Sequence, residues 1–186
     1  CRAARVHAVA SAPAGPTTVL VAGASGFVGR ALGPALAARH RVVGLSRQDR
    51  AGSDGYDRFL RCDLLSLEDT ERALVGVRVA VYLVHSMMPS ARLTQASFAD
   101  IDLLCADNFA RAAAKAGVER IVYLGGLIPG GGGGGGDEPG ALSEHLRSRL
   151  EVERVLASTG VPVTVLRAGS VLRERAGLVT AAPAPS

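Results

Sequence analysis

A buried strand that runs into three evenly spaced glycines constrains this chain more than any other feature. The stretch VLVAGASGFVGR begins at Val19, and the apolar run over 17–22 is typical of a strand that is covered on both faces. Apolar residues then recur at helical spacing from Phe27 to Arg39. The intervening glycines are Gly23, Gly26 and Gly29. The sequence therefore predicts a strand, a tight turn and a helix in immediate succession.

The same alternation continues along the chain. Short apolar runs predict strands at 17–22, 41–47, 58–64, 79–86, 120–127 and 162–169. Helical patterns fall between them at 27–39, 66–75, 93–116 and 141–159. We expect a kink at Pro34, and helix caps at Ser66, in a capping-box arrangement with Asp69, and at Ser143. Repeated strand–helix units predict an α/β fold, a doubly wound parallel sheet of about six strands.

Composition narrows the class of protein. The 186 residues suit one domain, and 48% are apolar but only 4% aromatic. The net charge of +4 comes from scattered arginines, which argues against a nucleic-acid partner, and no apolar run approaches the roughly 20 residues that span a membrane. The three separate cysteines, Cys1, Cys62 and Cys105, suggest no metal site and no disulfide framework. Free thiols fit a reducing cytoplasm.

Three segments fall outside this pattern. Residues 1–16 have no continuous apolar core and predict a disordered leader rather than a signal peptide. The glycine-rich stretch 129–140 has no Lys-Ser/Thr pair after it and predicts a mobile loop. Residues 173–186 lose periodicity and predict a disordered tail, which leaves 17–172 as one nucleotide-binding domain.

The position of the glycine triplet, between a buried strand and a helix, favours a dinucleotide site over a simple turn. The first glycine allows the turn, the second lets the backbone approach a pyrophosphate, and the third allows close helix–strand packing. The pyrophosphate would lie at the positive end of the helix. The loop residues expected at the cofactor are Gly23, Ala24, Ser25, Gly26, Phe27, Val28 and Gly29.

The end of the second strand predicts which cofactor is preferred. NAD sites commonly carry a carboxylate there to accept from the ribose 2′-hydroxyl. This chain has Ser46 and Arg47 instead, and a guanidinium pairs well with a 2′-phosphate. We therefore expect NADP(H) rather than NAD(H), although a solvated loop arginine would look the same in sequence.

Two further strand ends point to the same edge of the sheet. Asp63 and Leu64 follow the third strand, where the adenine would lie, and an ordinary strand-end Asp is an equally good interpretation. Val84, His85 and Ser86 end the fourth strand and are candidates for lining the nicotinamide ribose. His85 also fits a simple polar cap.

With these residues placed, the chain resembles the short-chain dehydrogenase/reductase superfamily. It is most similar to the atypical, NmrA-like members that are NAD(P)H-binding or nucleoside-diphosphate-sugar epimerase-like proteins. The stretches that carry the resemblance are VAGASGFVGRAL, CDL, YLVHSM, VERIVYLGGL, LSEHLRSRLEVERVL and VPVTVLRAGSVL, between 21 and 172. The resemblance implies a Rossmann domain followed by a small C-terminal substrate lobe.

The chain departs from the catalytic pattern of that family. Active members carry a Ser at the end of the fifth strand and Tyr-x-x-x-Lys on the next helix, whereas here Gly125 and Gly126 end the strand. His145 and Arg149 have the same four-residue spacing and are the catalytic candidates, His145 for proton transfer and Arg149 for a ribose hydroxyl. Both also fit the polar face of an amphipathic helix.

The sequence leaves the substrate and the oligomeric state open. Too few residues follow Leu172 to build a substrate lobe. We expect an NADP(H)-dependent oxidoreductase or epimerase-like protein with a degenerate catalytic site. The alternatives are a non-catalytic NADP(H) sensor or assembly factor, and a truncated gene product.

Overall fold

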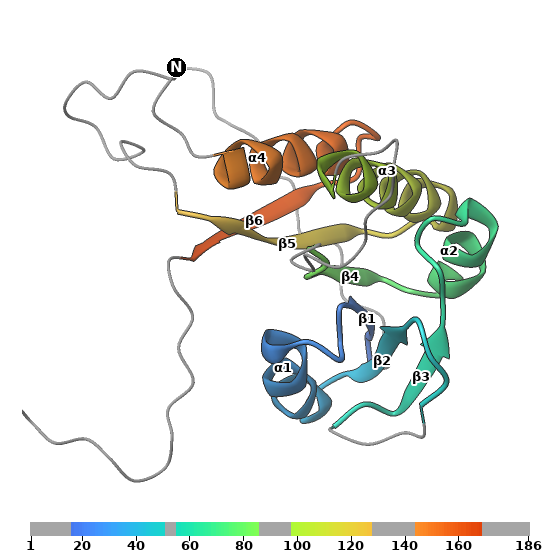
Figure 1. Cartoon of the computed structure of the whole chain (residues 1–186). Coiled ribbons are helices and arrows are strands. Elements are labelled where there is room, and N and C mark those ends of the chain that lie inside the picture. Colours follow the sequence, from blue (N-terminus) through green and yellow to red (C-terminus); the bar gives the residue numbers. More distant parts are fainter. Residues whose placement is uncertain (1–15, 51–54, 86–97, 128–143, 169–186) are drawn as a thin grey trace, which may run out of the picture.

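Six parallel strands form a single sheet in this computed structural model, which describes residues 16–50, 55–85, 98–127 and 144–168 (Figure 1). The leader apart from Pro16, the glycine-rich loop and the tail lie outside the described residues. The strands are β1 (Thr18–Ala22), β2 (Arg41–Ser46), β3 (Arg58–Arg61), β4 (Val79–Tyr82), β5 (Arg120–Gly126) and β6 (Val163–Ala168). Their order is β3-β2-β1-β4-β5-β6. This is the Rossmann-like α/β sheet that the sequence predicts.

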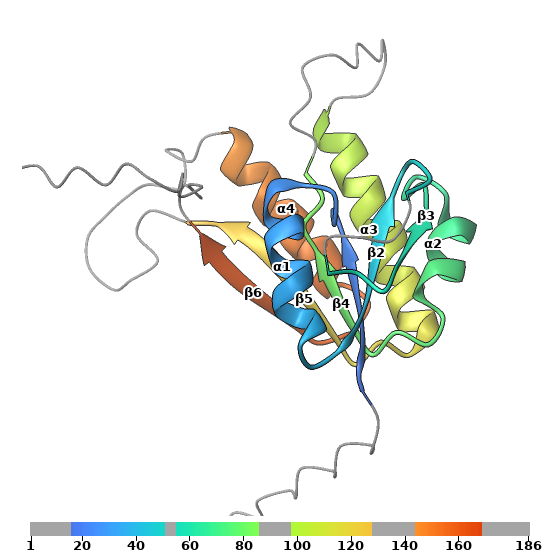
Figure 2. The same ribbon diagram turned by 90° about the horizontal axis from the view of Figure 1, so that it is seen from below.

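Helices cover both faces of the sheet. They are α1 (Phe27–Ala37), α2 (Leu67–Leu74), α3 (Phe98–Ala116) and α4 (Glu144–Ala157). The chain moves from β1 outward to β3, then crosses back and moves outward from β4 to β6. Because each crossover is right-handed, this reversal puts α1 on one face and the other helices on the opposite face. Figure 2 shows α1 on the near side of the strands, with α3 and α4 behind them.

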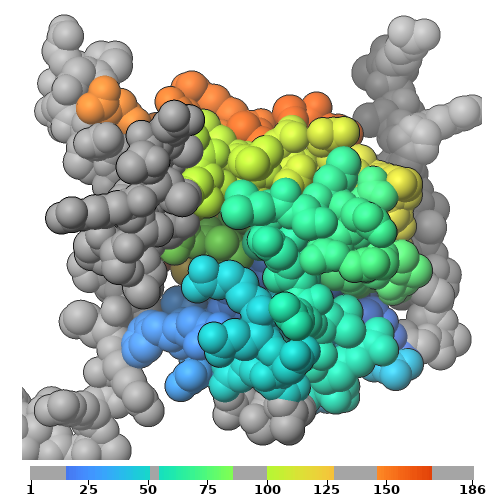
Figure 3. Space-filling model, turned by 45° about the vertical axis from the view of Figure 1, so that its right-hand side comes forward, coloured from blue at the N-terminus to red at the C-terminus, as the bar shows by residue number. Residues whose placement is uncertain are grey.

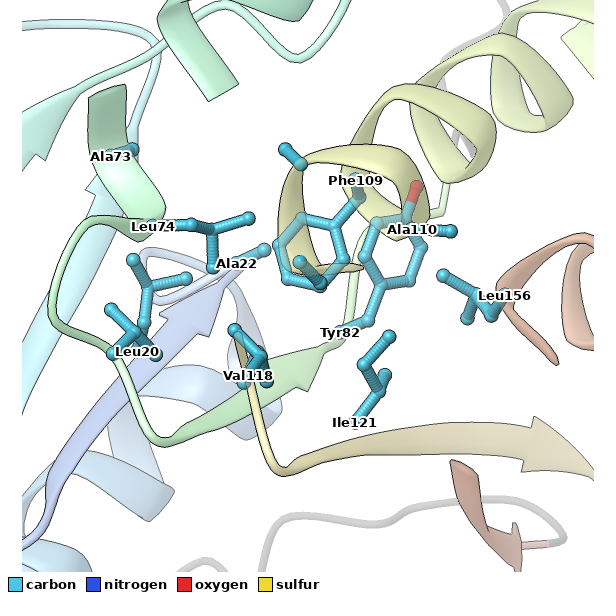
Figure 4. Packing of buried hydrophobic residues seen from close by; sticks show 14 of the residues in the cluster. Leu20, Ala22, Ala73, Leu74, Tyr82, Phe109, Ala110, Val118, Ile121 and Leu156 are labelled. Carbon is cyan, nitrogen blue, oxygen red and sulfur yellow. The ribbon is translucent and has the colours of Figure 1, made fainter. Parts of the chain in front are cut away.

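The larger half of the core lies between the sheet and α2, α3 and α4 (Figure 4). Tyr82 and Phe109 are both fully buried, and their rings meet edge to face with centroids 5.0 Å apart. Leu156 of α4 and Ile121 of β5 pack in the same cluster. A smaller cluster under α1 contains Val21 and Val42, with Leu32 and Leu36 packed against it. Within the described ranges, no helix is long and apolar enough to cross a membrane.

Helix α2 begins as predicted. The Ser66 hydroxyl accepts a hydrogen bond from the Asp69 amide at 3.2 Å. In the predicted capping box, the Asp69 carboxylate would accept a hydrogen bond from the Ser66 amide. In the structure it pairs with Arg72 on the next turn instead. Helix α1 continues through Pro34 without a break. The cap predicted at Ser143 lies outside the described residues.

The strands are shorter than predicted, most of all β3 and β4. β3 ends at Arg61, because the chain turns at Asp63, whose carboxylate accepts from the Leu65 amide at 3.0 Å. β4 ends at Tyr82, where its ladder with β1 ends at Ala22, although β5 on its other side continues to Gly126. The apolar residues that continue each run contact the core from irregular segments, as Leu64 and Val84 do.

Helix α3 also fixes the segment after β3. The Asn108 side-chain amide donates to the carbonyl oxygens of Leu64 and Leu65 at 2.9 and 3.1 Å. Asn108 is itself buried. Figure 3 shows the result as a continuous surface in which α2 lies against α3.

Truncating Phe109 tests the packing of the larger core. Phe109→Ala should lower the free energy of unfolding by about 3–5 kcal/mol, because it removes a fully buried ring and leaves a cavity. Leu104→Ala on the same helix is the control, since Leu104 is 49% exposed. Chemical denaturation measures both variants. Equal losses for the two would contradict the assignment of Phe109 to the core.

Candidate dinucleotide site

The site candidates gather at the carboxyl edge of the sheet, where β1 and β4 lie side by side. The chain changes direction between these two strands, and ligands of open α/β sheets bind in the crevice at such a point. The Leu83 amide donates to the Ala22 carbonyl at 3.0 Å, so the two strand ends stay joined where the glycine loop begins.

The loop after β1 makes a tight turn at Gly23. Its φ of 86° lies in the left-handed region that favours glycine. The Gly26 amide donates to the Gly23 carbonyl at 3.0 Å and closes the turn. A side chain at Gly23 would also approach the backbone of Leu83 to 3.1 Å.

Helix α1 begins in direct contact with this turn. A Cβ at Gly29 would lie 2.4 Å from the Gly23 carbonyl oxygen and 2.6 Å from Ala24 Cα, so no side chain fits there. The Tyr56 hydroxyl donates to the Gly29 carbonyl at 2.6 Å from the segment before β3. The start of α1 is therefore held from two sides.

The first turn of α1 carries backbone amides that find no backbone acceptor among the described residues. The amides of Phe27, Val28 and Gly29 have no backbone acceptor within the described part of the chain. Gly26 provides no side-chain cap, and the first turn has no acidic residue. Free amides at the positive end of a helix favour an anion.

The other loop side chains divide by exposure. Ser25 and Phe27 are exposed, and Val28 is half-buried. Ala24 is fully buried, and its Cβ leaves no room for a side chain at Gly44 of β2. Ala24 therefore has a packing role and presents no exposed surface to a ligand.

The end of β2 carries the two residues predicted to distinguish the cofactors. The Ser46 hydroxyl accepts from the Gln48 amide at 3.2 Å, and Arg47 is exposed. Burial raises the pKa of Cys105 on α3 to about 11, and the charge of Arg47 opposes that increase. Arg47 therefore carries an exposed positive charge directly after β2.

The candidates after β3 have structural partners. One Asp63 carboxylate oxygen accepts from the Leu65 amide, and the Asp63 carbonyl accepts from the Ser66 amide at 2.9 Å. The Leu64 side chain packs against the core. These contacts favour the ordinary turn role that the sequence left open for Asp63.

The segment after β4 contributes a pair of titratable side chains at this edge. His85 Nδ1 lies 3.0 Å from Asp102 Oδ2 of α3. Val84 packs against the core. Ser86 lies outside the described residues.

Asp102 is not among the site residues predicted from the sequence. It lies on the apolar stripe of α3, three and seven residues before the buried Cys105 and Phe109. A carboxylate on a buried stripe needs a partner, so the position of Asp102 on this stripe was the sequence feature that could have indicated a polar pair.

At the end of β5, Gly126 makes room for α4. A Cβ at Gly126 would lie 2.6 Å from Leu146 Cδ2 and 3.4 Å from Arg149 Cδ. Arg149 Nε is buried and has no hydrogen-bond partner within the described residues. The structure thus brings Arg149 to the strand end, while the side chain of His145 lies outside the described part of the chain.

These features define a Rossmann-type domain, and sequence comparison gives its family. A family model described as NAD(P)H-binding matches residues 23–185. The chain therefore belongs to the NAD(P)H-binding family, as the resemblance predicts. The auxiliary protein GraX of Staphylococcus aureus (strain NCTC 8325 / PS 47) is 31% identical over 110 residues, which are 58% of this chain and 36% of GraX.

Solved structures share the fold. The Bordetella bronchiseptica enzyme WbmH, in complex with NAD+, has a TM-score of 0.63 and 17% identity over 82% of this chain and 56% of WbmH. MoeE5, in complex with UDP-glucuronic acid and NAD, has a TM-score of 0.61 and 27% identity over 81% of this chain and 53% of MoeE5. The Thermus thermophilus UDP-glucose 4-epimerase complex with NAD has a TM-score of 0.61 and 23% identity over 81% of this chain and 54% of the epimerase. The chain spans about half the length of these structures and about a third of GraX.

Adding a side chain at Gly29 tests the contact between the loop and α1. Gly29→Val should lower the free energy of unfolding by about 1–3 kcal/mol, because the new side chain overlaps Gly23 and Ala24. The same displacement should remove NAD(P)H binding, measured by titration calorimetry.

The matched control is Ala31→Val, two residues further along α1 at an exposed position. It should keep NAD(P)H binding and cost at most the small helix propensity of valine, about 0.7 kcal/mol. If Gly29→Val behaves like Ala31→Val, the close contact has no role in stability or binding.

Proposed function

We propose that this domain binds NADP(H) across the carboxyl edge of its sheet and serves an oxidoreductase reaction. The observation that carries the proposal is the set of amides at the start of α1 that have no backbone acceptor within the described residues, next to a turn where no side chain fits at Gly29. A dinucleotide supplies the anion that such amides favour.

The pyrophosphate fits the first turn of α1. The close approach of Gly29 to Gly23 brings the helix start against the turn, and Gly26 adds no side chain above it. Phe27 and Val28 would donate their amides to phosphate oxygens, and the exposed Ser25 lies beside them. A fixed set of backbone donors binds an anion without paying for side-chain ordering.

Arg47 supports the preference for NADP(H). It directly follows β2 and is exposed. The strand end has Ser46 and Arg47 in place of the carboxylate that would accept a hydrogen bond from a ribose 2′-hydroxyl. A guanidinium can form two parallel hydrogen bonds with a phosphate. The solved structures described above hold NAD, so the preference rests on this chain's own residues.

The nicotinamide half would lie toward β4 and β5. His85 and Ser86 follow β4, and Arg149 lies against the end of β5 with a buried Nε that lacks a partner within the described residues. Arg149 would donate to the ribose in place of the family lysine, and its permanent charge prevents it from acting as a base. A bound nicotinamide dinucleotide supplies or accepts a hydride.

The proposed catalytic site is degenerate, because it lacks the serine and tyrosine of the family pattern. Gly125 and Gly126 stand where the family has a serine, and His145 stands in place of the tyrosine. The proposed substrate is a small molecule whose carbonyl is reduced or formed. The buried free thiols of Cys62 and Cys105 support a cytoplasmic location.

Reversing the charge at Arg47 tests the cofactor preference. The unmodified protein should bind NADPH more tightly than NADH by roughly 1.5–3 kcal/mol, which is about 10- to 150-fold in Kd. Arg47→Asp should remove that ratio, because its carboxylate repels the 2′-phosphate and can accept from a ribose hydroxyl. Titration calorimetry with both cofactors gives the two ratios.

Arg39→Asp is the matched control, since it makes the same change of charge at an exposed site beyond the far end of α1. It should leave the ratio of the two Kd values unchanged. Equal affinity of the unmodified protein for NADPH and NADH would contradict the preference.

A further inference from the structure

We propose that His85, held by the buried carboxylate of Asp102, is the acid–base group of this site. The inference rests on the function proposed above and assigns to this pair the proton transfer that the family gives to tyrosine. His145, the candidate from the sequence, is not needed for it.

The pair joins two elements at the edge of the sheet. His85 follows β4, and Asp102 lies on the second turn of α3, with His85 Nδ1 3.0 Å from Asp102 Oδ2. The Asp102 side chain is only 4% exposed, and the His85 side chain is 17% exposed. The carboxylate is therefore withdrawn from water, while the ring retains access to it.

Burial of Asp102 fixes how the imidazole is held. A buried carboxylate is costly unless it is hydrogen-bonded, and Nδ1–H of His85 is a donor at the right distance. A histidine that donates from Nδ1 has Nε2 as the nitrogen that can exchange a proton with a ligand. Asp102 is thus a positioning residue that selects the tautomer and orientation of His85.

The neighbouring titratable groups are poorly suited to the same task. Burial raises the pKa of Tyr123 to about 12 and that of Tyr82 well above its ordinary value, and the charge of Asp102 adds to both shifts. Burial likewise raises the pKa of Cys105 to about 11. These three groups stay protonated near neutral pH and make weak acids.

The position of the pair relative to the glycine loop supports the assignment. Leu83, two residues before His85, lies against Gly23 and is hydrogen-bonded to Ala22. His85 therefore follows directly from the point where the two strand ends meet at the proposed ligand crevice. Figure 1 shows β4 and α3 in the half of the fold that also contains β5 and β6, which the chain builds after it changes direction.

Reduction of a carbonyl needs a proton from His85 and a hydride, which a bound reduced nicotinamide dinucleotide would supply to the carbonyl carbon of the substrate. The carbonyl π pair would become the oxygen lone pair that takes the proton. Protonated His85 then gives its Nε2 proton to that oxygen and is left as a neutral imidazole, still bonded to Asp102. Solvent returns the proton, and the oxidation direction runs in reverse.

The first test is whether the His85 ring meets the nicotinamide. We expect NMR cross-relaxation between the His85 ring protons and the nicotinamide protons of bound NADP+, with His85 assigned by loss of its signals in His85→Gln. His40, which follows the far end of α1, is the internal control and should show none. Contacts of His85 only with the adenine, or none while NADP+ is bound, would overturn the assignment.

Failure of NADP+ to bind at all is a separate result, seen by calorimetry, and it would overturn the proposed function together with this inference. Loss of the His85 contact with retained binding overturns the inference alone. The two failures are therefore distinguishable.

The second test concerns Asp102. Nitrogen-15 shifts should show His85 protonated at Nδ1 in the unmodified protein, and Asp102→Asn should shift the ring toward the Nε2–H tautomer, because the amide can donate to Nδ1. Asp107→Asn, on the same helix and paired with Arg111, is the control and should leave the tautomer unchanged. An unchanged tautomer in Asp102→Asn would overturn the positioning role, and a folded spectrum for each variant excludes general unfolding as its cause.

Discussion

The structure depends on the contact between the start of α1 and the turn after β1. The backbone of Gly29 lies so close to Gly23 and Ala24 that no side chain fits between them. This contact sets the position of the helix, and with it the direction of the amides in its first turn. Tyr56 holds the same helix turn by bonding the Gly29 carbonyl, and buried Ala24 in turn packs against Gly44 of β2. One steric constraint thus joins the loop, the helix and two strands.

The order of the elements was predictable from the sequence because buried parallel strands and amphipathic helices have different periods. Each predicted strand and helix is present, and the errors are at the ends. β3 stops early because Asp63 turns the chain, and β4 stops where its ladder with β1 ends, although β5 continues beyond it. An apolar run shows which residues are buried, but it does not show whether they are buried from a strand or from the segment that follows.

The candidate site was predictable where backbone geometry decides it, and less so where side chains from distant elements meet. The glycine loop is local, so its spacing carried the prediction. The pair of His85 and Asp102 joins residues seventeen positions apart on a strand end and a helix, and only the stripe of α3 hinted at it. Arg149 was predicted from family spacing, but its buried Nε and its contact with Gly126 follow from how α4 packs.

The most direct measurement is amide hydrogen exchange with and without NADPH. The account predicts new protection at Phe27 and Val28, whose amides have no acceptor within the described residues and would bond to phosphate oxygens. A second surface provides the contrast, the shallow face between α3 and α4 that includes Leu103 and Val155. Protection confined to Leu103 and Val155, with none at Phe27 and Val28 at saturating NADPH, would contradict the account.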